Sequence, residues 1–193
     1  MKRVTYSMSM SLDGYIKGPD GSFDWGRPGA ETFAVATDEV RGLHTHLMGR
    51  NLYETMTYWE TAGTPGSGVE LDAAEDEFAT LWKALPKVVF TSTPVELVGN
   101  TRLALADLAA EIERVRREPG EGDIAIGGAA LAAAAADAGL IDEYRIRVFP
   151  VLVGGGTPFF ARGERFAELD LREQRTLDGE IAYLRYAVIR AAR

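Results

Sequence analysis

Two glycine-containing segments of this sequence carry residue types that can bind a phosphate group. Residues 47–51 read Leu-Met-Gly-Arg-Asn and residues 124–129 read Ile-Ala-Ile-Gly-Gly-Ala, and each lies between an apolar run and a helical pattern. The N-terminus of a helix offers unpaired N–H groups and the positive end of the helix dipole. Glycine lets a ligand approach the backbone, and the guanidinium of Arg50 can bind phosphate with two hydrogen bonds. Taken alone, each segment could equally be an ordinary turn before a helix, with no role in binding a ligand.

A third polar segment, Thr-Ser-Thr at 91–93, follows a short apolar run. Its hydroxyls can bind a phosphate or a ribose, and they can equally satisfy their own loop. All three segments follow predicted strands, and ligands of open α/β sheets collect at the carboxyl ends of the strands. Because all three segments are expected at this one edge of the sheet, they predict a phosphate-containing ligand there. The full G-x-G-x-x-G fingerprint of the usual dinucleotide-binding fold is absent. The residues predicted to bind it are Gly49, Arg50, Asn51, Thr91, Ser92, Thr93, Gly127, Gly128 and Ala129.

Composition narrows the class of protein. The formal net charge of −8 argues against a nucleic-acid or membrane-surface partner, because both need a basic face. The chain has no cysteine, which excludes disulfides and thiolate metal sites. His44 and His46 share one face of a predicted strand, but no third ligand is near, so we expect no metal. With no signal-peptide pattern and no apolar run of roughly 20 residues, we expect a cytoplasmic protein with one domain over 1–193.

Strands and helices alternate along most of the chain and end in a pair of strands around Asp178-Gly179. This order predicts an α/β fold with a mostly parallel sheet and an antiparallel C-terminal edge. Strands are expected at 4–10, 43–48, 87–91, 123–126, 143–153, 169–176 and 181–190. Helices are expected at 32–41, from an Asn51 cap to about 59, at 71–85, from an Asp107 cap to 117, and at 128–138.

Four stretches in this order resemble the dihydrofolate reductase superfamily, and most closely its branch that contains the pyrimidine reductase domain of riboflavin biosynthesis. The stretches are 9–16 (SMSLDGYI), 47–54 (LMGRNLYE), 126–131 (IGGAAL) and 147–160 (RVFPVLVGGGTPFF). The resemblance covers essentially the whole chain. It implies a three-layer α/β fold around a sheet of about eight strands, NADPH as the cofactor, and a homodimer.

The resemblance also implies roles for particular residues. Arg50 and the helix start at Asn51 would hold cofactor phosphates, and 91–93 would contact the adenosine ribose and its 2′-phosphate. Gly127 and Gly128 would lie beside the pyrophosphate and the nicotinamide. The loop 13–29 with Trp25, and the loop 154–158 with Gly155, would form the substrate side of the pocket. Tyr53 follows Arg50 within one helical turn and is a further candidate for that pocket.

Hydride transfer to a C=N or C=O bond leaves negative charge that a proton source must neutralise. Folate-reducing relatives use a carboxylate on the helix after the Trp-containing loop, and Glu31 is the carboxylate nearest to that place here. It can equally be an acidic residue favoured by the helix dipole. Asp13 is the other candidate, although Asp-Gly is also a common turn dipeptide. The absence of a clearly matched acid argues against folate as the substrate.

These patterns predict an NADPH-dependent reductase of a small heterocycle. By resemblance, the substrate is a pyrimidine of the riboflavin pathway, as in a 5-amino-6-(5-phosphoribosylamino)uracil reductase. Two alternatives stay open at this point. One is a dihydrofolate or pterin reductase, and the other is a non-catalytic regulatory protein that binds NADP.

Overall fold

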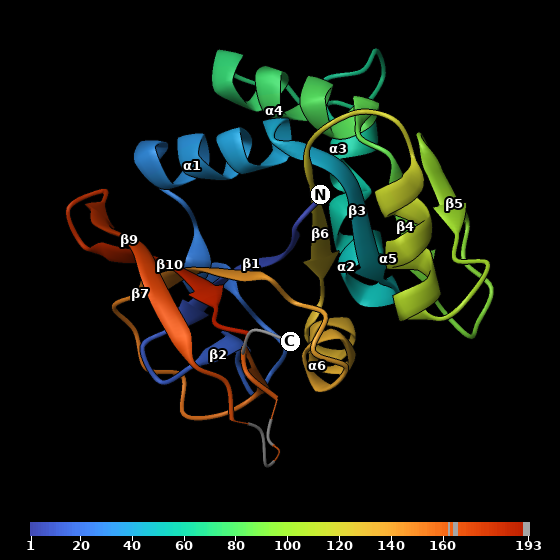
Figure 1. Ribbon diagram of the computed structural model, residues 1–193. Coiled ribbons are helices and arrows are strands. Elements are labelled where there is room, and N and C mark those ends of the chain that lie inside the picture. Colours follow the sequence, from blue (N-terminus) through green and yellow to red (C-terminus); the bar gives the residue numbers. More distant parts are fainter. Residues whose placement is uncertain (162, 164–165, 191–193) are drawn as a thin grey trace.

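The computed structural model describes residues 1–161, 163 and 166–190 (Figure 1). In this part of the chain, eight strands form a sheet in the order β5-β4-β3-β6-β1-β7-β10-β9, and β2 pairs with β8 beside it. All pairs from β5 to β7 are parallel, whereas β10 runs antiparallel to both β7 and β9. The predicted sheet and its antiparallel C-terminal edge are therefore confirmed. The strands are β1 (Val4–Ser11), β2 (Tyr15–Lys17), β3 (Leu43–Gly49), β4 (Lys87–Phe90), β5 (Thr101–Leu103), β6 (Asp123–Gly127), β7 (Glu143–Phe149), β8 (Thr157–Pro158), β9 (Leu169–Leu177) and β10 (Ile181–Val188).

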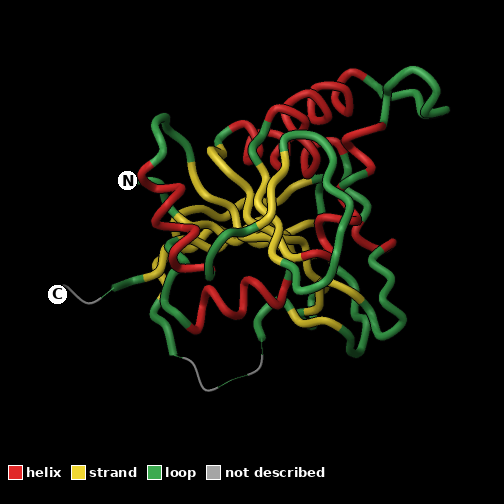
Figure 2. The backbone as a smooth tube through the Cα atoms, turned by 90° about the vertical axis from the view of Figure 1, so that its right-hand side faces the viewer, coloured by secondary structure: helices red, strands yellow, loops and turns green. Residues whose placement is uncertain are grey.

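Helices lie on both sides of the large sheet, which gives the three layers (Figure 2). Consecutive strand residues face opposite sides. Leu47 accordingly packs in one cluster with Ile112 of α5, whereas Met48 packs in another with Phe78 of α4. The helices are α1 (Ala30–Arg41), α2 (Arg50–Met56), α3 (Tyr58–Thr61), α4 (Ala73–Ala84), α5 (Leu108–Arg117) and α6 (Ala129–Asp137), with a 3₁₀ turn η1 (Asp24–Gly26).

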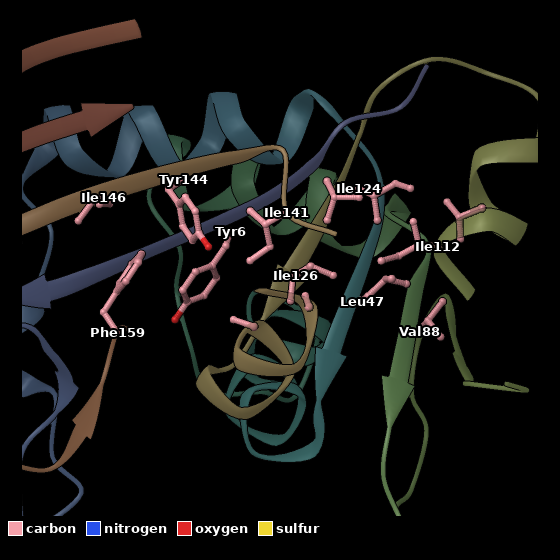
Figure 3. Packing of buried hydrophobic residues seen from close by; sticks show 14 of the residues in the cluster. Tyr6, Leu47, Val88, Ile112, Ile124, Ile126, Ile141, Tyr144, Ile146 and Phe159 are labelled. Carbon is pink, nitrogen blue, oxygen red and sulfur yellow. The ribbon is translucent and has the colours of Figure 1, made fainter. Parts of the chain in front are cut away.

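The larger core cluster fixes the central strands beneath α5 and α6 (Figure 3). Val4, Leu47 and Ile124 have no exposed surface, and Tyr6 and Ile126 are 1% exposed. Such apolar runs suit parallel strands that are covered on both faces. The carboxyl ends of β1, β3 and β6 are thereby held in a fixed relation to one another. None of the helices in the described ranges is long and apolar enough to cross a membrane.

The structure departs from the predicted elements where the sequence signal is weak. β5 and β8 were not expected, because strands of three and two residues are too short to show a periodicity. The strand predicted at 143–153 ends at Phe149, because Pro150 has no N–H to continue the ladder. The helix expected to run to about 59 divides at Thr57 into α2 and α3.

The turn between β9 and β10 caps α1 from a distance of almost 150 residues. Asp178 accepts hydrogen bonds from the backbone N–H groups of Glu31 (2.9 Å) and Thr32 (3.1 Å), and its own N–H donates to the Glu31 carboxylate (2.5 Å). Gly29 is the N-cap and has no side chain to do this. A Cβ on Gly29 would overlap the Asp178 carboxyl group, so glycine makes room for the external cap.

We expect Asp178→Gly to destabilise the protein by about 0.5–2 kcal/mol, the usual cost of losing an N-cap. Glycine suits the positive φ of 51° at this position, so backbone strain does not contribute. Glu180→Gly in the same turn is the matched control, because it adds the same flexibility to the unfolded chain. Urea unfolding measures both. Equal free energies of unfolding for the two variants would show that the external cap adds nothing.

Candidate active site

A cavity of about 730 Å³ opens at the carboxyl ends of the central strands. Its walls come from β1 and β2, from the region of η1, from the start of α2 after β3 and from the start of α6 after β6. Arg147 of β7 and Thr157 of β8 complete the lining. In Figure 1, α6 lies below the end of β6 and α2 lies beside β3. The cavity therefore occupies the edge at which the sequence predicts a ligand.

The two glycine junctions meet at this cavity because β3 and β6 are neighbouring parallel strands. Met48 lies opposite Gly127 in the ladder, so the next residue of each strand lies at the same level. A Cβ on Gly128 would be 3.9 Å from the backbone nitrogen of Gly49. Gly49, Gly128 and Ala129, three of the residues predicted to bind a cofactor, all line the cavity.

Asn51 does not cap a helix, contrary to the prediction. The N-cap of α2 is Gly49 and no side chain binds its first N–H groups, so Asn51 lies within the first turn and lines the cavity. Gly128 is the N-cap of α6, also without a side-chain cap, and its φ of 92° favours glycine. The first N–H groups of α6 thus remain available to a ligand.

Gly127 has a packing role that differs from its predicted contact with a ligand. It is buried and is not part of the cavity lining. A Cβ there would come within 2.6 Å of His46 Nε2 and would also overlap the side chain of Leu52. The missing side chain lets Leu52 of α2 pack directly on β6.

The structure brings Arg50 and the segment 91–93 together. The Arg50 guanidinium donates to Thr93 Oγ1 and, through Nε, to Glu54 Oε1 at 2.7 Å. Thr91 Oγ1 donates to the Thr93 carbonyl (2.9 Å) and accepts from the Thr93 N–H (3.1 Å), so it satisfies its own loop. Ser92 is exposed. Arg50 lines the cavity, whereas 91–93 flank it from beyond that side chain.

Neither candidate acid reaches the cavity. Asp13 accepts from the N–H groups of Val153 (3.2 Å) and Gly154 (2.8 Å), so it holds the loop after β7. A hydrogen bond from Ser11 and these backbone bonds keep the pKa of Asp13 below its usual range, which makes it a poor proton donor at neutral pH. Glu31 binds the β9–β10 turn. Among the described residues, no carboxylate lines the cavity.

Of the three residues predicted for the substrate pocket, one lines the cavity and two do not. Trp25 lines the cavity and packs edge-on against Phe149, with ring centroids 5.8 Å apart. Tyr53 does not line it: the side chain is 2% exposed and its hydroxyl accepts from the Val98 N–H at 2.8 Å. Gly155 lies beside Pro19, outside the lining, and Thr157 reaches the cavity from the same loop.

The structure adds two basic residues that the sequence patterns did not single out. Lys17 and Arg147 line the cavity together with Arg50. Arg147 is only 8% exposed, and its Nη1 donates to Glu39 Oε2 at 3.0 Å. One feature of the sequence could have indicated Arg147. Arginines at 145 and 147 alternate with apolar residues in a strand, so both lie on one face of that strand.

Glu39 is the centre of the buried polar frame that holds Arg147. It accepts from the hydroxyls of Ser7 (2.6 Å) and Tyr183 (3.0 Å) as well as from Arg147. Burial alone would raise the pKa of Glu39, but the positive charge of Arg147 and the Ser7 hydrogen bond bring it below its usual range. Glu39 is therefore ionised at neutral pH, and the frame pairs two opposite charges.

Two other polar regions offer less to a ligand. A hollow of similar volume at the opposite edge of the sheet is lined by Arg3, Asp123 and Arg145, which already pair with one another and with Glu143. His46 is partly buried, and the loss of solvent around its ring lowers its pKa to about 4. Within the described part of the chain, no group of three or more metal-ligand side chains occurs.

Three layers around a mostly parallel sheet, with a cavity at the strand ends, define a dihydrofolate reductase-like α/β protein. A structure of dihydrofolate reductase from Enterococcus faecalis in complex with NADP(H) shares the fold, with a TM-score of 0.60 at 14% identity over 96% of both chains. The chain belongs to the RibD C-terminal domain family, which matches residues 2–183.

Two similar proteins span nearly the same length. One is an uncharacterised protein of Bacillus subtilis, YyaP, which is 26% identical over 188 residues, or 96% of this chain and 94% of that protein. The other is the crystal structure of a putative riboflavin biosynthesis protein from Shewanella, with a TM-score of 0.75 at 23% identity over 97% of this chain and 99% of that one. The fold and family implied by the resemblance are thus confirmed.

Gly127→Ala tests the close packing of α2 on β6. We expect it to lower the free energy of unfolding by about 1–3 kcal/mol, because the added methyl group overpacks the contact with Leu52 and His46. Gly49→Ala is the matched control, because a Cβ there meets nothing within 4 Å and its φ of −74° suits alanine. Urea unfolding distinguishes the two. Similar stabilities would mean that Gly127 has no special packing role.

Proposed function

We propose that this protein is an NADPH-dependent reductase that transfers a hydride to a small heterocycle, with a pyrimidine intermediate of the riboflavin pathway as the first candidate. The observation that carries the proposal is the single cavity with two different ends. One end has Arg50 beside Thr93 and the N-terminus of α6, and the other has Trp25 and Arg147. Membership of the RibD C-terminal domain family supports the same class of reaction.

The residues at the first end fit a phosphate-bearing cofactor. A guanidinium has five donors, and Arg50 uses two of them within the protein. No atom lies within 4 Å of where a Cβ on Gly49 would be, so a ligand can approach the backbone there. The N–H groups at the start of α6 add further donors for an anion. NADPH, when bound, supplies the hydride, and these residues would hold and orient its phosphates.

The second end bears on the choice of substrate. Reduction of dihydrofolate by a side-chain acid needs a carboxylate within hydrogen-bond reach of the substrate. In the described residues, Glu31 and Asp13 are both held outside the cavity by backbone N–H groups. This arrangement favours a substrate that takes its proton from water over a pterin that takes it from a carboxylic acid.

Arg50→Ala tests the cofactor end. We expect this variant to lose roughly 1–3 kcal/mol of NADPH affinity, which is the range for hydrogen bonds to charged groups. Titration of NADPH fluorescence measures it, and NADH, which lacks the 2′-phosphate, is titrated in parallel. Arg117→Ala, at the far end of α5, is the control for a general change in charge. Unchanged NADPH affinity in Arg50→Ala would contradict the assigned role of this residue.

Turnover tests the substrate and the alternatives. We expect the protein to oxidise NADPH in the presence of 5-amino-6-(5-phosphoribosylamino)uracil. The reaction is measured as the loss of absorbance at the nicotinamide band. We expect Glu31→Gln to have the same rate as the wild type. Turnover of dihydrofolate that is lost in Glu31→Gln would instead establish a folate reductase. Tight binding of NADPH without turnover of pyrimidines, pterins or quinones would establish a regulatory protein.

A further inference from the structure

The charge of the cavity is opposite to that of the protein as a whole. The chain carries a formal net charge of −8, yet Lys17, Arg50 and Arg147 line the cavity and, within the described residues, no carboxylate does. Arg50 belongs to the proposed cofactor end. Lys17 lies over the ring of Phe23, with its Nζ 5.3 Å from the centroid, and is only partly buried. Arg147 is the most enclosed of the three.

Arg147 is held rigidly while it still borders the cavity. Its Nη1 donates to Glu39 at 3.0 Å, its Nε lies 3.4 Å from Ser9 Oγ, and Glu39 is in turn fixed by Ser7 and Tyr183. These two contacts use two of the five guanidinium donors. A guanidinium with fixed position and unused donors at a cavity wall is prepared to bind an oxygen or nitrogen acceptor.

The wall beside Arg147 has a second donor without an acceptor. Trp25 packs on Phe149, which shares a face of β7 with Arg147. The Trp25 Nε1 atom is buried and has no hydrogen-bond partner among the described residues. This wall therefore places the Arg147 guanidinium beside the Trp25 indole, with no carboxylate in the described lining, which suits a heterocycle with carbonyl or imine acceptors.

We propose that Arg147 is a catalytic residue that binds the heteroatom of the substrate's C=O or C=N bond and stabilises the negative charge formed there. The inference rests on the proposed reductase function. The hydride of NADPH adds to the carbon of this bond, and the π electrons move to the heteroatom. Arg147 stabilises that heteroatom until a water molecule supplies the proton. The products are NADP⁺, the reduced substrate and a hydroxide ion that solvent neutralises, so electrons, protons and charge balance.

The frame around Arg147 dictates how it must be tested. Arg147→Met alone would leave Glu39 buried without its cationic partner, and that loss can unfold the protein. The test variant is therefore Glu39→Gln/Arg147→Met, which removes both charges at nearly constant volume. Glu39→Gln alone, which keeps the guanidinium, is the matched control. Arg147→Lys keeps a positive charge beside Glu39 and provides a second, conservative variant.

The assay measures NADPH oxidation with 5-amino-6-(5-phosphoribosylamino)uracil and, separately, NADPH affinity by fluorescence. We expect kcat/KM of the double variant to fall roughly 100-fold below that of Glu39→Gln, as for loss of one charge-stabilising donor. NADPH affinity should be unchanged, Arg147→Lys should be intermediate, and millimolar guanidinium should partly restore the rate of the double variant, whereas urea should not.

Equal kcat/KM in the double variant and Glu39→Gln would overturn the inference and leave the reductase function intact. A loss of NADPH affinity in the double variant would also overturn it, because Arg147 would then belong to the cofactor end. Wild-type protein that binds NADPH but reduces no substrate would instead remove the proposed function itself. If the double variant does not fold, Arg147→Lys with wild-type kcat/KM would still reject a catalytic role.

Discussion

The parallel pairing of β3 with β6 is the constraint on which the rest of the site depends. In their ladder Met48 lies opposite Gly127, 79 residues further along the chain, and the carboxyl ends of the two strands emerge side by side. Each strand is followed at once by a helix, so Gly49 and Gly128 both become helix N-caps on one edge. Gly127 contributes by having no side chain, because only then can Leu52 of α2 pack against the strand. The close approach of the two backbones thus brings both helix N-termini to one cavity, where we propose that cofactor phosphates bind.

Buried charge organises the other half of the cavity. Glu39 fixes the guanidinium of Arg147 through a frame that spans α1, β1, β7 and β10. Burying a charge is costly unless it is paired and hydrogen-bonded, and this carboxylate has three donors. A second buried pair, Lys87 with Glu60 at 3.0 Å, joins the start of β4 to α3. At Arg147 the acidic partner thus lies behind the cavity wall, and the described lining keeps basic side chains without a carboxylate.

Much of the fold was predictable because it is encoded by local patterns. The apolar runs before Gly49 and Gly127, the Asp107 cap and the hairpin around Asp178 all gave elements within a few residues of those observed. The glycine junctions that line the cavity were predictable for the same reason, since a strand, a glycine and a helix start are contiguous. β5 and β8 were not predicted, because segments of two or three residues show no periodicity. They are strands only because they pair with β4 and β2.

The sequence by itself determined the class of fold, the family and the glycine junctions, since each depends on residues that are adjacent in the chain. Tertiary structure alone decided what the polar side chains do. Glu31 and Asp13 look equally suited to proton transfer until Asp178 and the loop at 153–154 are seen to engage them. Arg147 looks like an ordinary strand residue until β7 places it at the cavity wall against Glu39. The physical reason is that a charged group's role depends on its partners and its burial, and both come from segments more than 100 residues away.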